Sequence, residues 1–478
     1  MRLYKLIENI AQTNLPDIEI TDITSDSRKK LSGSGMFVCI KGNSFDGHDY
    51  AEKMLSNGAA IVVTERDLGI ENQIIVEDTR KVFSKLCSAW FSHPEREMRF
   101  VGVTGTNGKT TITTVIKKVL TEFGFKVGLI GTCQNEIGDE IYHTERTTPE
   151  PYDLFELLRM MADKECDFAV MEVSSQGLEQ GRTGDCYFET AVFTNLTQDH
   201  LDVHGTMENY YQAKKKLFDV CRTAIVNIDD NSGRRYFSEI KCNKVSFGID
   251  SDDAYYKAYD VKLNADGVSY TLRDGKDEHK ISFAMPGSFN VSNSMAVVAC
   301  CEQLGFDGAK VAEVLGRLCR VRGRAEVVPT GRDFTVICDY AHTPDALENI
   351  LPAIKSGANG RIVCLFGCGG NRDSKKRPLM AKAAAENADF LIVTSDNPRD
   401  EDPDAIIDDV VVGLNGSTTP YIRITDRREA IHWAIQNAKK DDIIVLAGKG
   451  HEDYQVLSGG VRIHFDEREV VAEALAQL

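Results

Sequence analysis

The chain has few of the features that mark nucleic-acid-binding, membrane or secreted proteins. Basic residues are in the minority, with 56 Lys and Arg against 73 Asp and Glu, and the formal net charge is -17. Because a phosphate backbone requires a basic footprint on the protein, this balance excludes nucleic acid as the main partner. The opening segment MRLYKLIENIAQ carries charges throughout and contains no continuous apolar run. We therefore expect no signal peptide, no membrane anchor and a cytoplasmic location.

Cysteine and proline are also uninformative as markers of special structure. The 13 Cys are odd in number and include no CxxC pair, which favours reduced thiols over a disulfide framework or a zinc site. Cys364 and Cys368 have the closest paired spacing, and we interpret them as small buried residues. Proline is sparse, at 12 residues, and no internal repeat or low-complexity tract marks a domain boundary. Domains must therefore be located from the pattern of strands.

What the sequence does contain is an ordinary globular composition with alternating strand and helix patterns. Hydrophobic residues make up 42% and charged residues 27% of the 478 residues. Short apolar runs alternate with helical patterns, which indicates an α/β fold with parallel sheets. At roughly 150 residues per domain, the length favours about three domains. We predict domains over residues 1–98, 99–325 and 326–478.

Polar, Gly-rich or acidic clusters follow the predicted strands of the second and third domains. These strands begin at Phe100, Phe168, Ala191, Ala224, Phe334, Arg361, Phe390 and Asp442. In open α/β sheets, ligands bind outside the carboxyl ends of the strands. We therefore expect the clusters to converge on one face of each domain, so that a ligand between two domains contacts both sets.

The most specific motif is TGTNGKTT, from Thr104 to Thr111, between a predicted strand and a predicted helix. A phosphate site needs backbone N–H groups, a helix N-terminus, a lysine and a hydroxyl that holds the metal, and all four are present. The strict P-loop spacing is not met, because Val103 occupies the first glycine position, so we expect a variant P-loop. The residues predicted to bind ATP here are Gly105, Thr106, Asn107, Gly108, Lys109, Thr110 and Thr111.

Three further features of the middle third leave alternatives open. Glu172 ends the apolar run FAVME, where it fits a magnesium ligand of a P-loop enzyme or a solvated strand end. His200 and His204 have the spacing of a zinc pair, but Mg-ATP chemistry prefers oxygen ligands, and we favour a nucleotide and magnesium role. The three adjacent lysines of the helix YYQAKKKLF have the pattern of a solvated face.

In the last third, two short turns combine acids, amides and cations. They are DYAHTP, from Asp339 to Pro344, and DNPR, from Asp396 to Arg399, and their prolines stiffen them. Arg372 and Arg399 can each bind a carboxylate through two parallel hydrogen bonds, which suggests an amino-acid substrate. The alternative is that each forms a surface ion pair.

Taken together, the segments TGTNGKTT, MEVSSQGL, FTNLTQDHLDVHG, GSFNVSN, RGRAE, DYAHTP and AGKGHEDYQ resemble the Mur ligase family. These are the ATP-dependent amino-acid ligases that build the peptidoglycan stem peptide. The similarity runs in order from about Ser25 to Gln455. Within the family, the tetrad from Asp396 to Arg399 resembles the members that add 2,6-diaminopimelate, because the lysine-adding relatives depart at the Arg position.

The resemblance implies a UDP-sugar domain, a central P-loop ATPase-like domain with a parallel or mixed sheet, and a Rossmann-like domain for the amino acid. For the UDP-muramoyl dipeptide it implies contacts from Ser25, Ser27, Asn43, Ser44, Phe45, Arg146, Thr147, Thr148, Ser174, Gln180 and Arg182. For ATP it adds Asn290, Asn293, Arg324 and His342. For diaminopimelate it implies Arg372, Asp396, Asn397, Pro398, Arg399, Gly448 and Glu452.

ATP and Mg²⁺ are the cofactors that the resemblance implies. It assigns the metal to Thr110, Glu172, His204 and Lys214, and the catalytic roles to Lys109, Glu172, His200 and Lys214. By alignment of QAKKKLF, Lys214 is expected to be carbamylated by CO₂, which turns an ammonium of ordinary pKa about 10.4 into an anionic magnesium ligand. Lys215 and Lys216 keep the solvated interpretation.

The function implied is transfer of the ATP γ-phosphate to the D-glutamate γ-carboxylate, followed by attack of the diaminopimelate amine on the acyl phosphate. The cleft must close to bring the reacting atoms within about 3 to 3.5 Å, so domain motion is predicted. The partners are small molecules, and the oligomeric state is left open, with a monomer as the expectation. The alternatives are a lysine-adding Mur ligase, a folylpolyglutamate synthetase, or a P-loop ATPase or binding protein that makes no amide bond.

Overall fold

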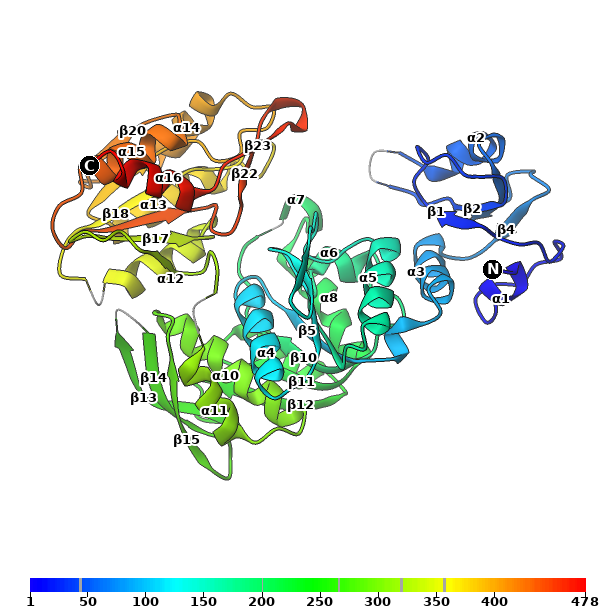
Figure 1. Cartoon of the computed structure of the whole chain (residues 1–478), viewed down its shortest axis with the longest axis horizontal. Helices are drawn as coiled ribbons and strands as arrows, with labels where there is room; N and C mark the ends of the chain where they lie inside the picture. Colours follow the sequence, from blue (N-terminus) through cyan, green and yellow to red (C-terminus); the bar gives the residue numbers. More distant parts are fainter. Residues whose placement is uncertain (43–44, 200, 265–266, 319–320, 356–357) are drawn as a thin grey trace.

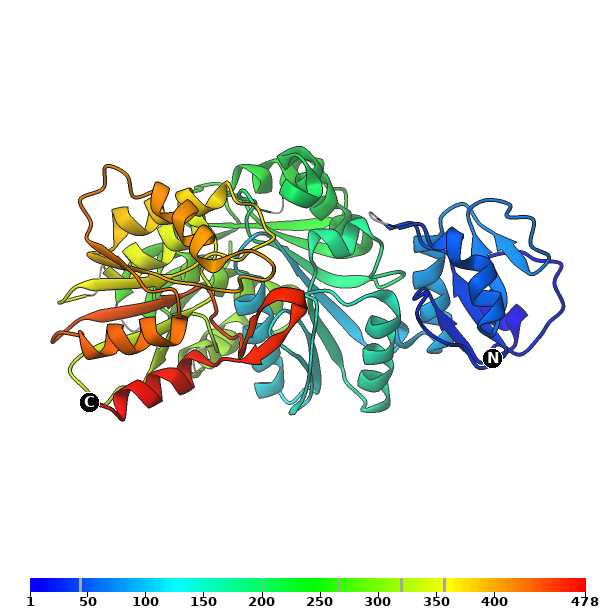
Figure 2. The same ribbon diagram turned by 90° about the horizontal axis from the view of Figure 1, so that it is seen from above.

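The computed structural model describes the chain except residues 43–44, 200, 265–266, 319–320 and 356–357. The described residues form three α/β units in chain order, each built on its own sheet (Figure 1). Seen from above, the N-terminal and C-terminal units lie at opposite ends, with the central unit between them (Figure 2). The predicted α/β fold with three domains is confirmed.

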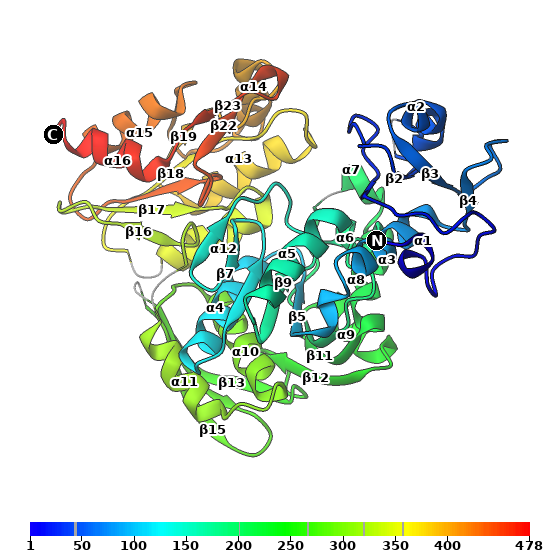
Figure 3. The same ribbon diagram turned by 45° about the vertical axis from the view of Figure 1, so that its right-hand side comes forward.

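The N-terminal unit is a parallel sheet of order β1-β2-β3-β4. Its apolar runs become strands because near-continuous hydrophobic segments suit parallel strands that are covered on both faces. The strands are β1 (Asp22–Thr24), β2 (Gly35–Val38), β3 (Ala59–Thr64) and β4 (Gln73–Ile75), and the helices are α1 (Leu3–Leu6), α2 (Ala51–Ser56) and α3 (Thr79–Trp90). α3 packs against α5 (Pro151–Asp163) of the central unit (Figure 3).

The central unit is an 11-stranded mixed sheet of order β15-β14-β13-β12-β11-β10-β5-β9-β6-β7-β8. Its strands from β13 to β6 run parallel, and antiparallel neighbours extend it at both ends. The strands are β5 (Arg99–Thr104), β6 (Val127–Ile130), β7 (Asn135–Ile137), β8 (Glu140–Tyr142), β9 (Phe168–Glu172), β10 (Phe188–Phe193), β11 (Cys221–Asn227), β12 (Asn243–Gly248), β13 (Tyr256–Asn264), β14 (Gly267–Arg273) and β15 (Glu278–Phe283).

Helices cover both faces of the central sheet. Besides α5, they are α4 (Lys109–Glu122), α6 (Ser175–Glu179), α7 (Leu201–His204), α8 (Met207–Lys215), α9 (Asn231–Glu239), α10 (Ser288–Gln303) and α11 (Gly308–Arg317). α4 packs its apolar side chains together with α10 and α11 against one face, and Gly124 follows its last turn with φ 88°. The core of the other face continues into the N-terminal unit, so these two units are packed as one body on that side.

The C-terminal unit is a six-stranded sheet of order β16-β17-β21-β18-β19-β20, parallel except for β16. Its strands are β16 (Glu326–Val328), β17 (Thr335–Asp339), β18 (Ile362–Phe366), β19 (Phe390–Val393), β20 (Tyr421–Arg423) and β21 (Ile443–Ala447). Its helices are α12 (Pro344–Lys355), α13 (Lys376–Asn387), α14 (Pro403–Val412), α15 (Arg427–Gln436) and α16 (Glu467–Leu475), and β22 (Tyr454–Val456) pairs with β23 (Arg462–His464) in a separate hairpin.

Two expectations from composition can be compared with this fold. Cys364 and Cys368 are buried, as interpreted, and the described cysteines are free thiols. Among the described residues, no helix combines the length and the apolar character needed to cross a bilayer.

Candidate active site

The P-loop connects β5 to α4, as the motif predicts. Gly108 has φ 87°, and a Cβ there would lie 2.6 Å from Asn293 Oδ1, so the turn requires glycine for both conformation and space. Lys109 Nζ donates to the carbonyl oxygens of Gly105 and Thr106, at 2.9 Å each. Burial lowers the pKa of Lys109, although Glu172 and Asp199 act in the opposite direction. The lysine is thus held over the loop whose amides would receive a phosphate.

Glu172 and Thr110 lie together beneath this loop. Glu172 is 1% exposed, and its carboxylate accepts hydrogen bonds from Thr110 Oγ1 at 3.0 Å and from the backbone N and Oγ1 of Thr132 at 2.9 Å each. Arg324 Nη2 donates to Thr110 Oγ1 at 3.0 Å, from the far side of the cleft. This oxygen-rich set is the kind that Mg²⁺ prefers, so the donors present fit the predicted metal. Thr132, which follows β6, was not predicted from sequence.

The three adjacent lysines of α8 and the turn after it have different surroundings. Lys214 is 1% exposed, and its Nζ donates to the Gly105 carbonyl oxygen at 2.9 Å. Burial lowers the pKa of Lys214 well below its usual value, and the charge of Lys109 adds to this shift. Lys215 pairs with Glu239, and Lys216 is exposed. The interpretation of the three lysines as a solvated face is therefore wrong for Lys214. Its burial beside the P-loop agrees with the functional role that the family resemblance implied for it.

Of the two predicted histidines, the structure describes His204, whose ring is engaged by neighbouring side chains. His204 is buried on α7, and its Nε2 lies 2.8 Å from Ser175 Oγ while its Nδ1 lies 3.1 Å from Glu179 Oε2. Coordination of a metal by His204 would require one of these contacts to open. His200 lies outside the described residues, as do Asn43 and Ser44.

A cavity of about 410 Å³ opens beside the P-loop, between the central and C-terminal units. Its walls include the loop residues from Thr106 to Thr111, Glu172 and Asn293, together with Arg324 and His342. Asn290 does not reach the wall. It is fully buried, and its Oδ1 accepts a hydrogen bond from Asn293 Nδ2 at 3.0 Å, so it orients Asn293.

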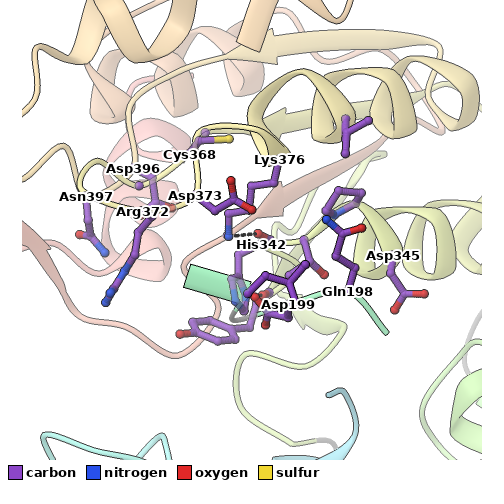
Figure 4. Close-up of a pocket in the computed structure, with 18 of the residues that line it drawn as sticks. Gln198, Asp199, His342, Asp345, Cys368, Arg372, Asp373, Lys376, Asp396 and Asn397 are labelled. Carbon is purple, nitrogen blue, oxygen red and sulfur yellow. Dashed lines mark hydrogen bonds between the residues drawn. The ribbon is translucent and has the colours of Figure 1, made fainter. Parts of the chain in front are cut away.

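A second cavity, of about 450 Å³, lies against the carboxyl ends of the strands of the C-terminal unit (Figure 4). It shares Asp199, Tyr340, His342 and Asp345 with the first cavity. The two sets of strand-end clusters thus meet between the units, and the predicted convergence is confirmed. Asp345 strengthens the junction, because its Oδ2 accepts a hydrogen bond from Asn107 Nδ2 of the P-loop at 2.6 Å.

His342 occupies this junction with a defined tautomer. Its Nδ1 lies 2.8 Å from the Tyr340 carbonyl oxygen, which can only accept, so the proton is on Nδ1. Burial lowers the pKa of His342 to about 4, and the neighbouring Lys376 acts in the same direction. The imidazole is therefore neutral at pH 7.

Six of the seven residues predicted to contact diaminopimelate line the second cavity. They are Arg372, Asp396, Asn397, Arg399, Gly448 and Glu452. Pro398 is buried behind the wall. Arg399 Nη1 donates to the Gly370 carbonyl oxygen at 2.9 Å, and within the described part of the chain neither Arg372 nor Arg399 forms an ion pair. Burial lowers the pKa of Arg399, and the charge of Arg372 adds to this shift, so the pair makes a cationic wall.

The acidic side of the same cavity is ordered by a residue that the sequence prediction omitted. Lys449 is fully buried, and its Nζ donates to Asn397 Oδ1 at 2.8 Å and to Glu452 Oε2 at 3.0 Å. It also lies 3.7 Å from Asp396 Oδ1. The sequence could have indicated Lys449, because it lies in AGKGHED between the predicted contact residues Gly448 and Glu452.

A third cavity, of about 1020 Å³, lies between the N-terminal unit and the central unit, which also share a hydrophobic core. Gln180 is the predicted residue on its wall, among described residues. The basic side chains there are Lys41, Arg80, Lys81 and Lys85, none of which was predicted. They come from separate segments, and no motif marks them.

The other described residues among those predicted to contact the muramoyl dipeptide do not line the third cavity. Ser25 and Ser27 are half-buried, Phe45 is 53% exposed, and none of the three lines the third cavity. Thr147 lies on the nucleotide cavity, and Arg146 is exposed and pairs with Glu150.

Thr148, Ser174 and Arg182 are engaged with the chain itself. Thr148 Oγ1 donates to the Glu172 carbonyl oxygen, and Ser174 Oγ accepts from the backbone of Gly177 as the cap of α6. Arg182 donates to the Thr148 carbonyl oxygen at 2.8 Å and to Gln180 Oε1. These contacts shape the strand-end region around Glu172.

The fold and the site define a class of protein: a three-domain α/β protein with a P-loop, whose nucleotide cavity adjoins a second cavity lined by Arg372 and Arg399. The chain belongs to the Mur ligase family. Residues 19–96 match the model described as "Mur ligase family, catalytic domain", residues 103–301 the "Mur ligase middle domain", and residues 323–450 the "Mur ligase, glutamate ligase domain".

Similar proteins cover the full length of the chain. It is 43% identical over 484 residues to the UDP-N-acetylmuramoyl-L-alanyl-D-glutamate--2,6-diaminopimelate ligase of Caldanaerobacter subterraneus subsp. tengcongensis, over 100% of this chain and 99% of the relative. The ligase of the same name from Clostridioides difficile is 42% identical over 487 residues, with 100% of both chains covered.

Solved structures agree with this similarity. One of a UDP-N-acetylmuramoyl-L-alanyl-D-glutamate--2,6-diaminopimelate ligase has a TM-score of 0.72 and 32% identity, covering 100% of this chain and 99% of that one. The folylpolyglutamate synthase of Mycobacterium tuberculosis complexed with ADP has a TM-score of 0.62 at 16% identity, over 78% of this chain and 92% of that one. The latter likeness concerns the fold alone.

Proposed function

We propose that the chain is an ATP-dependent ligase that adds meso-2,6-diaminopimelate to the D-Glu γ-carboxylate of UDP-N-acetylmuramoyl-L-Ala-D-Glu. The product is the nucleotide-linked tripeptide of peptidoglycan precursor synthesis, with ADP and phosphate released. The proposal is supported by relatives of that name at 43% and 42% identity over the whole chain. It assigns the UDP-sugar to residues 1–98, ATP to 99–325 and the amino acid to 326–478.

The observation that carries the proposal is the cationic wall of Arg372 and Arg399 in a cavity that adjoins the nucleotide cavity. Within the described structure these two guanidinium groups form no ion pair, so they can bind a carboxylate of a ligand. Asp396 and Glu452 on the same cavity provide for an ammonium. Diaminopimelate has a distal ammonium and a distal carboxylate, whereas lysine has only the ammonium, so this wall favours diaminopimelate.

Activation of the carboxylate is the first chemical requirement, because a carboxylate and an amine otherwise form only a salt. The D-glutamate γ-carboxylate oxygen attacks the γ-phosphorus of ATP, the bond to the β-phosphate oxygen breaks, and ADP leaves. Lys109 and the amides of the P-loop bind the phosphates and offset the charge that develops on them. Thr110 and Glu172 would hold Mg²⁺, which supplies charge neutralisation for the transferred phosphoryl group.

Lys214 is the proposed carbamate. Only an uncharged amine reacts with CO₂, and the burial that lowers the pKa of Lys214 raises the fraction of the uncharged form. The amine nitrogen bonds to the carbon of CO₂ and loses a proton, which gives an anionic carbamate within the P-loop region. An anion there complements Lys109, which donates to the same Gly105 carbonyl oxygen as Lys214.

Amide formation follows at the junction of the two cavities. The amine of diaminopimelate attacks the acyl carbon of the acyl phosphate. The tetrahedral intermediate then collapses as the bond between the acyl carbon and the phosphate oxygen breaks, and phosphate leaves with the electron pair of that bond. The wall of Arg372, Arg399, Asp396 and Glu452 orients the amino acid, which lowers the entropic cost of the encounter. Because one chain contains all three cavities, we propose a monomer as the active unit and the cytoplasm, where nucleotide-linked precursors and ATP are available, as its location.

The test is amide formation from the UDP-linked dipeptide, ATP and either meso-diaminopimelate or L-lysine. We expect product with diaminopimelate and a much lower rate with lysine. Equal rates would sink the diaminopimelate assignment and leave a ligase of broader specificity. Phosphate release that requires neither acceptor nor amino acid would instead support an ATPase that makes no bond.

A further inference from the structure

Lys449 is separated from the second cavity by the residues that it contacts. It does not appear on the cavity wall, although Gly448 and Glu452 on either side of it do. Its side chain is completely buried in the turn after β21. The backbone at Gly448 has φ 118°, and a Cβ there would lie 2.8 Å from Asp396 Oδ2, so the turn is fixed tightly against the acidic wall.

The hydrogen bonds of Lys449 determine how Asn397 is presented. Asn397 Oδ1 accepts from Lys449 Nζ at 2.8 Å and from the backbone N of Val456 at 2.9 Å. With two donors at the oxygen, the amide cannot be reversed without losing both bonds. Asn397 Nδ2 then donates to Glu452 Oε2 at 3.1 Å.

The same lysine determines which oxygen of Glu452 is available. Lys449 Nζ and Asn397 Nδ2 both donate to Oε2 of Glu452, so within the described residues Oε1 is the oxygen left for a ligand. Burial raises the free energy of ionised Asp396, but Lys449 and then Arg427 outweigh this effect and lower its pKa. Two carboxylates and one ammonium leave a single negative charge, which matches one ammonium of an amino-acid substrate.

We infer that Lys449 is a positioning residue for the amino-acid substrate, which holds Asp396 and Glu452 side by side as acceptors for the distal ammonium and fixes the orientation of the Asn397 amide that hydrogen-bonds Glu452. It acts through these three residues and does not touch the substrate. This inference rests on the proposed function and extends it to a residue outside the cavity wall. Lys449 is the strongest of the charges that lower the pKa of Asp396, so without it Asp396 takes up a proton at a higher pH.

The experiment compares Lys449→Met with the wild type in steady-state amide formation at pH 6, 7 and 8. We expect the KM for diaminopimelate to rise on the order of 10-fold or more at pH 7, with a smaller change in kcat and an unchanged KM for ATP. The KM of the variant should rise further as the pH falls from 8 to 6, because protonation removes a partner of the ammonium. That of the wild type should stay level over the same range.

Two further variants separate positioning from a general loss of structure. The double variant Lys449→Met with Asp396→Asn leaves one carboxylate, and its KM should lose the pH dependence. The matched control is Lys382→Met, an exposed lysine on α13, which should behave as the wild type. If Lys449→Met does not fold, Lys449→Arg takes its place and should keep a KM that is level with pH.

The possible failures are distinct. A wild-type protein that makes no amide with diaminopimelate refutes the proposed function. A Lys449→Met variant with an unchanged KM, or with a raised KM that is equally level with pH, refutes only the positioning role. A pH-dependent KM in Lys449→Arg would overturn it as well.

Discussion

The nucleotide cavity and the amino-acid cavity adjoin, but the chain prepares them in opposite ways. In the nucleotide cavity the predicted binding groups are bonded to one another: Lys109 to carbonyl oxygens of the P-loop, and Thr110 to Glu172. In the amino-acid cavity the cations Arg372 and Arg399 line the wall with no ion pair inside the described structure. The nucleotide cavity must give up some of these internal hydrogen bonds to bind its ligand. In the amino-acid cavity, the two guanidinium groups are left to pair with a carboxylate of the ligand.

This difference follows from the ligands each site is proposed to bind. ATP brings its own charge and a metal, so the protein can keep a self-bonded loop and exchange its contacts for stronger ones. An amino acid is small and zwitterionic, and discrimination depends on single groups. Arg399 is half-buried, and a partly desolvated cation left without its carboxylate costs free energy, which penalises a substrate that lacks the group.

The largest expected effect on activity comes from replacing Lys109 in the nucleotide cavity. Lys109→Ala removes the cation that offsets charge on the transferred phosphoryl group, so amide formation should fall on the order of 1,000-fold or more. The measurement is the rate of ADP and tripeptide formation, with Lys216→Ala, an exposed lysine, as the control. A fall of less than about tenfold would remove Lys109 from phosphate binding.

Lys214 should give the next largest effect. Lys214→Ala is expected to lower kcat about 100-fold to 1,000-fold, since it removes an anionic group proposed to act near the phosphates. The lowered pKa of Lys214 raises the fraction of uncharged amine, which is the form that reacts with CO₂, so wild-type activity should fall in CO₂-depleted buffer and return with bicarbonate. Lys215→Ala should keep that response. Full activity of Lys214→Arg, which cannot be carbamylated, would contradict the proposal.

A substitution of Arg399 tests the role of the amino-acid cavity. Arg399→Ala should leave the KM for ATP unchanged and reduce the preference for diaminopimelate over lysine by about 10-fold to 100-fold. The loss should be in the rate with diaminopimelate, because lysine has no distal carboxylate to lose. The ratio of kcat/KM for the two amino acids measures it, with Arg428→Ala on the exposed face of α15 as the control. An unchanged ratio would exclude Arg399 as the specificity residue.

The sequence predicts the two sites unequally, for a physical reason. A P-loop is local, since one strand, one turn and one helix N-terminus place Lys109 and Thr110, and the pattern from Phe100 to Gly124 therefore yields both the elements and the site. The amino-acid cavity joins the ends of β18, β19 and β21. Residue chemistry indicated Arg372 and Arg399 as carboxylate-binding cations, but only the family resemblance placed them in one site with Glu452. Neither route found Lys449, which acts behind the wall.

Burial was the property hardest to predict. Three adjacent lysines have one pattern in sequence, yet packing against the P-loop buries Lys214 and leaves Lys216 exposed. The antiparallel extension from β13 to β15 was also not predicted, because its runs alternate apolar and polar residues and lack the polar strand-end clusters used to find the others. The basic wall of the third cavity joins Lys41, in the loop after β2, with Arg80, Lys81 and Lys85 of α3, a contact that only tertiary structure creates.

The smallest expected effect lies where the two cavities meet, at Asp345. Asp345→Asn keeps a side chain that can accept from Asn107 but removes the charge, so the KM for ATP should change only about twofold to fivefold. Burial raises the pKa of Asp345, so the folded protein binds this proton more tightly than the unfolded chain.

The sign of its pH dependence follows from that shift. Ionisation of Asp345 lowers the free energy of unfolding as the pH rises through its folded pKa, and the contribution is recovered as the pH falls. Wild-type stability relative to Asp345→Asn should therefore increase in urea unfolding as the pH falls from 7 toward the ordinary carboxyl pKa of 3.8, whereas the exposed Asp250→Asn should show no such change. A relative stability that decreases over this range would mean that Asp345 is stabilised as an anion, and that the junction between the cavities has a cationic environment like that of the amino-acid cavity.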